Sequence, residues 1–98
     1  MKIIEKMLHA LSEEIEGAEN YAEQYIEHKA RGVMHKASRY KEMSLDELKH
    51  AEYLRDFYII DVDAYKTVYS MSDEEAHQWE HGLKKCAEKM ATIKLMLM

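Results

Sequence analysis

Residues 33–54 read VMHKASRYKEMSLDELKHAEYL, and the fold depends on whether a helix begins or continues inside this stretch. Ser44 followed three residues later by Glu47 has the form of a capping box, which would start a helix at Ser44. The residues before Ser44 are already periodic, however, and contain no Gly or Pro as far back as Gly32. We therefore expect Glu47 to lie in the interior of a long helix.

The composition predicts an all-α protein. The chain has no proline, three glycines, and 47% hydrophobic residues spread among charged ones. Hydrophobic residues at steps of three and four predict helices over 3–31, 33–60 and 72–97. The break at Gly32 is so short that the first two helices should form a long antiparallel hairpin.

The second and third helices are expected to be joined by residues 61–71, which are rich in Asp and in β-branched or aromatic residues. Ser72 and Glu75 form a capping box at the predicted start of the third helix, with acidic residues in its first turn. The closing KLMLM is unusually apolar for a chain end, so we expect it to pack against another surface.

Length and charge narrow the class of protein. A chain of 98 residues is a single domain with a small core, and self-association is expected, giving a homo-oligomer of at least two chains. With 19 acidic and 14 basic side chains, nothing indicates binding to nucleic acid or an anionic membrane.

The lone Cys86 is expected to be a small core residue. The N-terminal MKIIEKMLHALSEEIEG is interrupted by acids, which predicts neither signal peptide nor membrane span and favours a cytoplasmic location.

Three polar residues fall on faces that should be buried. Glu14 shares the apolar stripe of the first helix, and Glu47 with His50 lies on that of the second. Taken singly, Glu14 could reach water from the edge of its stripe, and His50 could be a partly exposed histidine. Together they can meet at one level of the hairpin, where a buried carboxylate needs a partner, a proton or a metal. Glutamate oxygens and an imidazole suit iron or manganese and, less exclusively, zinc.

Glu14 with Tyr21 seven residues on, then Glu47-x-x-His50 after a 33-residue interval with Gly32 at the turn, resembles the ferritin-like superfamily, and bacterioferritin most closely. The resemblance covers about residues 8 to 58. It implies oxidation of Fe(II) by oxygen at a ferroxidase centre with two metals about 3.5–4 Å apart. Glu14 and His50 would be terminal ligands, Glu47 a bridging ligand, and Tyr21 a hydrogen-bonding catalytic residue nearby, or alternatively a plain interface aromatic.

A complete ferritin-like bundle has a second set of ligands on a third and a fourth helix, and this chain has no room for a fourth. Glu74 and His77 have the right spacing but lie off the apolar stripe, so we expect them to be solvated, while Glu80 lies nearer to it. The resemblance therefore implies a homodimer in which two hairpins build the four-helix bundle around two Fe ions, or Mn or Zn. Encapsulated ferritins are similar in completing their site in this way, which also allows an encapsulating shell as a partner.

Two other functions fit the same residues. One keeps the metal but acts as a rubrerythrin-like peroxidase or a manganese oxidase. The other is a non-enzymatic helical oligomerisation module, in which Lys or Arg from a second chain neutralises the inward carboxylates. Glu13, Glu16 and Glu19 are either an acidic approach for Fe(II) or an ordinary solvated face.

Overall fold

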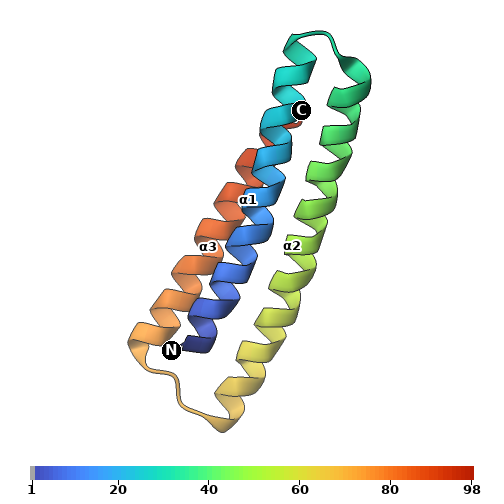
Figure 1. The fold of residues 1–98 in the computed structure, drawn as a ribbon. Coiled ribbons are helices and arrows are strands. Elements are labelled where there is room, and N and C mark those ends of the chain that lie inside the picture. The colour runs from blue at the N-terminus through green and yellow to red at the C-terminus, as the bar shows by residue number, and fades with distance from the viewer. Residues whose placement is uncertain (1) are drawn as a thin grey trace.

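The computed structural model describes residues 2–98 and consists of three helices packed along a rod 54 Å long (Figure 1). They are α1 (Lys2–Ala30), α2 (Met34–Val68) and α3 (Asp73–Met96). The prediction of an all-α fold built on a long antiparallel hairpin is confirmed. Within residues 2–98, no helix combines the length and the apolar run that crossing a membrane requires.

The turn between α1 and α2 depends on Gly32, which has a positive φ of 75°. Glycine adopts this left-handed conformation without the steric cost that other residues pay. The amide of Gly32 donates to the carbonyl of Lys29 at 3.1 Å, and that of Val33 donates to the carbonyl of His28 at 2.9 Å. These bonds satisfy carbonyls that the end of α1 would otherwise leave without partners.

Helix α2 passes through Ser44 without interruption, which places Glu47 in mid-helix as predicted. The Ser44 side chain is fully buried and its hydroxyl donates to the carbonyl oxygen of Ala18 in α1, at 2.7 Å. Ser44 therefore joins two helices and does not cap one.

The end of α2 was predicted wrongly. The helix continues past residue 60 to Val68, so the connector is shorter than the expected 61–71. Val62 is buried and packs in a cluster with Ile4 and Trp79, and this contact stabilises the extra turns. Unfavourable helix propensities of Asp and β-branched residues amount to at most about 0.7 kcal/mol each, which such burial offsets. No Gly or Pro in the segment forces an earlier end.

Helix α3 begins with the predicted capping box. The amide of Glu75 donates to the Ser72 hydroxyl at 3.1 Å, and the amide of Ser72 donates to a Glu75 carboxylate oxygen at 3.3 Å. Farther along, a Cβ added at Gly82 would lie 2.6 Å from both methyl groups of Leu8, so the absent side chain lets α3 approach α1 closely. In the closing KLMLM, Leu97 is buried as expected, but Met98 is exposed.

The largest buried cluster joins all three helices. It consists of Ile15, Ala18, Ala22, Tyr25, Ala37, Leu48, Ala51, Met90, Ile93 and Leu97. Cys86 is only half-buried and packs against this cluster, where burial raises the pKa of its thiol.

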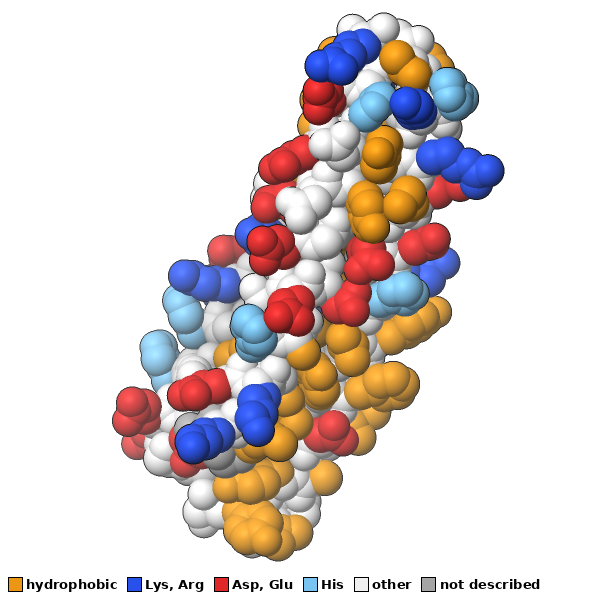
Figure 2. Space-filling view, in the orientation of Figure 1, with side chains coloured by type: hydrophobic (Ala, Val, Ile, Leu, Met, Phe, Trp, Pro, Cys, Tyr) orange, Lys and Arg blue, Asp and Glu red, His pale blue; other side chains and the backbone are white. Residues whose placement is uncertain are grey.

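Helix α3 covers one side of the α1/α2 hairpin and leaves the other side exposed (Figures 1 and 2). We call this other side the open face. Glu14 of α1 and Glu47 and His50 of α2 lie on it, and helical spacing puts Met43 and Phe57 on the same side of α2. Met43 and Phe57 follow the hydrophobic period of α2, yet their side chains are 40% and 63% exposed. The stripe of α2 is wider than one chain can cover, and its outer part reaches solvent.

Candidate metal centre

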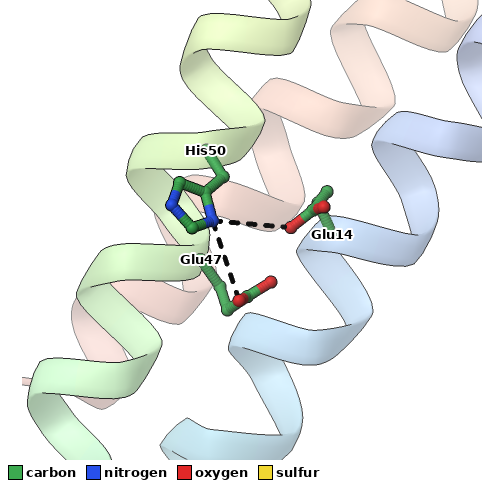
Figure 3. A group of neighbouring side chains, drawn as sticks. All are labelled: Glu14, Glu47 and His50. Atoms are coloured by element: carbon green, nitrogen blue, oxygen red, sulfur yellow. Dashed lines mark ion pairs between the residues drawn. The ribbon is translucent and has the colours of Figure 1, made fainter.

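Glu14 of α1 and Glu47 and His50 of α2 point toward one another across the hairpin (Figure 3). His50 Nδ1 lies 4.0 Å from Glu14 Oε2 and 3.8 Å from Glu47 Oε1. One ligand atom from each residue lies within 4.8 Å of the other two. The structure thus brings together the three side chains that the sequence singled out, and we call them the triad.

The two helices cover the triad on one side, and solvent reaches it on the other. The side chains of Glu14 and Glu47 are 33% and 28% exposed, while that of His50 is 58% exposed. Figure 2 shows acidic side chains gathered midway along the open face, with hydrophobic ones on either side. An ion or a second chain could therefore reach the triad without any rearrangement of the helices.

The neighbouring Glu14 makes the carboxyl group of Glu47 harder to ionise. The pKa of Glu47 is raised above its ordinary value, chiefly by a hydrogen bond with Glu14, then by burial and by the negative charge of Glu14. His50 opposes this shift and Asp46 adds slightly to it. Among residues 2–98, no Lys or Arg forms an ion pair with either carboxylate. A divalent cation bound between the two carboxylates would remove the repulsion that raises this pKa.

Gly17 provides the space for the Glu47 carboxylate. A Cβ added at Gly17 would lie 3.3 Å from Glu47 Oε2, closer than most side-chain contacts allow. A glycine inside a helix costs about 1 kcal/mol relative to alanine, so α1 is weakened at the point where the carboxylate of α2 approaches it. The cost is explained if the carboxylate needs room to turn between ligands.

The donor set fits a divalent metal ion. Two carboxylates and one imidazole suit iron, manganese or zinc. Bonds of about 2.0–2.2 Å to one ion would bring the ligand atoms to within roughly 3–4 Å of one another, a small contraction for side chains this exposed. Three ligands also leave coordination positions open, which oxygen, water or residues of a second chain could fill.

Tyr21 lies seven residues after Glu14 on α1. Within residues 2–98 it forms no hydrogen bond with the triad. Its ring stacks on that of Tyr40, with ring centres 6.3 Å apart, and Tyr40 in turn lies 5.1 Å from the ring of His28. The role expected for Tyr21 in catalysis remains a prediction.

The other candidate ligands lie outside the triad. Glu74, His77 and Glu80 are exposed on α3, as expected for the first two. Within the proposed acidic approach, Glu13 pairs with His9 at 2.9 Å and Glu19 pairs with Lys89 at 3.5 Å. These two acids therefore already have partners on the surface.

Sequence reasoning missed the contributions of Gly17 and Ser44. The helical period gave one usable signal, because Ser44 is a polar residue on the buried side of α2, in line with Ala37, Leu48 and Ala51. For Gly17 the signal was a glycine inside a helix, where it costs stability, but the contact it permits comes from another helix.

Comparison with models of known protein families, with characterised proteins and with solved structures gives no match. The function is therefore argued from the site itself.

Proposed function

We propose that the chain is a ferroxidase-type iron-binding protein, in which two copies together form a di-iron carboxylate site that oxidises Fe(II) with oxygen. The observation that carries this proposal is the triad. Two carboxylates and an imidazole face one another in mid-rod, and no Lys or Arg among residues 2–98 neutralises them. The family resemblance stated above supports iron over the other metals that such ligands accept.

One triad is half of such a site. Glu14, Glu47 and His50 supply three ligands, whereas a di-iron carboxylate centre of a four-helix bundle takes its ligands from four helices. The open face carries exposed apolar side chains on both sides of the triad, including Met43 toward the turn and Phe57 toward the other end. A second copy laid on this face would bury them and supply the missing ligands.

The charge distribution supports an antiparallel pair. Residues 27–42, around the α1/α2 turn, contain five Lys or Arg and two acids, while residues 2–6 and 61–75, at the opposite end of the rod, together contain six acids and three Lys. A twofold axis through the two triads, perpendicular to the rod, would set the basic end of each copy beside the acidic end of the other. A parallel pair would place like charges together.

Lys36 and Asp61 are placed to make this contact. Lys36 lies about three helical turns before Glu47 and Asp61 about four turns after it, so all three project from the same side of α2. At 1.5 Å per residue they lie roughly 16 Å and 21 Å from Glu47 in opposite directions along the helix. In the antiparallel pair, Lys36 of each copy therefore faces Asp61 of the other.

The proposed reaction balances without a further reductant or oxidant. Two Fe(II) substrate ions each lose one electron, and one oxygen molecule accepts both electrons with two protons to become hydrogen peroxide. The carboxylates favour the higher charge of the Fe(III) product, because negative oxygen ligands stabilise a trivalent ion more than a divalent one.

The test is oxygen uptake. Protein loaded anaerobically with Fe(II) and then mixed with aerated buffer should consume oxygen faster than Fe(II) alone. Glu47→Ala should abolish the acceleration, whereas Glu42→Ala, which removes an exposed acid from the same helix, should keep it. Equal uptake by the wild type and Glu47→Ala would exclude the proposal.

The same preparation separates the two alternative functions. Faster turnover with hydrogen peroxide than with oxygen would select a rubrerythrin-like peroxidase, and manganese retained on purification would select a manganese oxidase. A dimer whose thermal midpoint is unchanged by Fe(II), Mn(II) and Zn(II) would select a structural module, since a ligand that binds only the folded state must stabilise it.

A further inference from the structure

Helix α3 carries two exposed imidazoles that belong to no part of the triad. His77 and His81 are four residues apart, and their rings lie nearly parallel, with centres 5.9 Å apart and an interplanar angle of 11°. Within residues 2–98, neither ring forms a hydrogen bond or an ion pair. In contrast, His9 pairs with Glu13, and His28 hydrogen-bonds to the Gln24 carbonyl.

We propose that His77 and His81 bind one divalent transition-metal ion on the outer surface of α3. Residues four apart on a helix lie one above the other, so two imidazoles at this spacing can reach a single ion. Two imidazole nitrogens, each about 2.0–2.1 Å from a tetrahedral ion, set the ring centres roughly 5 Å apart. The observed ring centres are 5.9 Å apart, and the nearly parallel rings must turn until one nitrogen of each points at the same ion; both side chains are exposed and free to turn.

Acidic side chains surround His77. Glu74 lies one turn before it, and both residues line a surface cavity of about 860 Å³ at the start of α3, where Glu5 and Glu75 add negative charge. Paired imidazoles select Ni(II), Cu(II) or Zn(II) over Mg(II) or Ca(II). This site is independent of the proposed ferroxidase centre, since it lies on another helix and uses none of its ligands.

Calorimetric titration of the untagged protein with Ni(II) tests this site. His77→Ala and His81→Ala should each lower the affinity of this site about a hundredfold, because the surviving imidazole loses its chelating partner. His35→Ala is the matched control: His35 is also exposed, but arginines occupy the positions four residues away on both sides. Its removal should leave the affinity unchanged.

Glu47→Ala separates this site from the triad. It should retain the Ni(II) binding that His77→Ala loses, whether or not the ferroxidase proposal holds. The three histidine variants replace exposed helical residues by alanine, a strong helix former, and helical content measured by circular dichroism should be unchanged. Unchanged Ni(II) affinity in His77→Ala and His81→Ala, or an equal loss in His35→Ala, would overturn the proposal.

Discussion

The hydroxyl of Ser44 in α2 donates a buried hydrogen bond of 2.7 Å to the carbonyl oxygen of Ala18 in α1. Ala18 lies one turn after Glu14, and Ser44 lies one turn before Glu47. This single bond therefore fixes how far α2 is shifted along α1 at the level of the triad. It also explains why a polar residue occupies the buried stripe of α2.

Ser44→Ala should destabilise the protein despite the better helix propensity of alanine. A buried hydrogen bond contributes about 1 kcal/mol net, and its loss also leaves a small void beside Ala18. Ser38→Ala, at an exposed position of the same helix, measures the propensity gain alone. Urea unfolding should show Ser44→Ala less stable than Ser38→Ala by about 1 kcal/mol. Equal stability would mean that the bond does not hold the helices together.

The two helical glycines at packing contacts should respond in opposite ways to alanine. Gly17→Ala should raise the stability of the metal-free protein by up to about 1 kcal/mol, because the Glu47 carboxylate can move away from the new methyl group. The same displacement should weaken Mn(II) binding to the triad, measured by titration. A variant that binds Mn(II) as tightly as the wild type would show that Glu47 needs no such space.

Gly82→Ala should lower stability instead. Its new Cβ would lie 2.6 Å from both Leu8 methyl groups, so α3 must move or Leu8 must change rotamer. Overpacking of this kind costs about 1–3 kcal/mol, which exceeds the propensity gain of about 1 kcal/mol. Thermal unfolding should show a lower midpoint, while Mn(II) affinity per folded chain stays unchanged.

The raised pKa of Glu47 predicts the direction of a pH effect in the metal-free protein. Above the ordinary glutamate pKa of about 4.3, the folded state holds more protons than the unfolded state, so stability falls as pH rises. Glu47→Gln has no carboxyl group to ionise at this position, so it avoids this decrease in stability. It should therefore be more stable than the wild type at pH 7, with the advantage shrinking toward pH 4.

Glu42→Gln is the control for this comparison, because Glu42 is an exposed acid of the same helix. Denaturant unfolding at several pH values in the presence of a chelator provides the measurement. The same pH dependence in Glu47→Gln and Glu42→Gln would contradict the raised pKa of Glu47. Added Mn(II) should reverse the order, stabilising the wild type and leaving Glu47→Gln unchanged.

Charge reversal tests the antiparallel pairing. Lys36→Glu and Asp61→Lys should each weaken the dimer roughly tenfold, because two symmetric ion pairs of up to about 1 kcal/mol each are lost per dimer. The double variant should recover most of the affinity, since the charges then attract again. Sedimentation at several concentrations measures the dissociation constants. A double variant weaker than either single one would contradict this orientation.

Much of the fold follows from local chemistry that the sequence displays. The turn at Gly32 was predictable because glycine readily adopts the left-handed conformation that ends a helix. The start of α3 was predictable because Ser72 and Glu75 have the spacing of a capping box. The end of α2 was not predictable, because the burial of Val62 against Ile4 and Trp79 outweighs the weak helix propensities around it. That contact involves residues far apart in the chain.

In the candidate site, too, local features were predictable from the sequence and contacts between helices were not. Glu14, Glu47 and His50 could be identified from helical spacing and from the position of the turn, since both are local properties. The space at Gly17 and the bond from Ser44 depend on how closely two helices approach, which no periodic pattern specifies.

In the proposed assembly, one chain supplies half of a metal site and a second chain completes it. Native mass spectrometry of protein loaded anaerobically with Fe(II) measures this arrangement directly. We expect a dimer, or a larger even-numbered oligomer, that holds one metal ion per chain, and we expect Glu47→Ala to lose the metal. A monomer without bound iron would exclude the shared site.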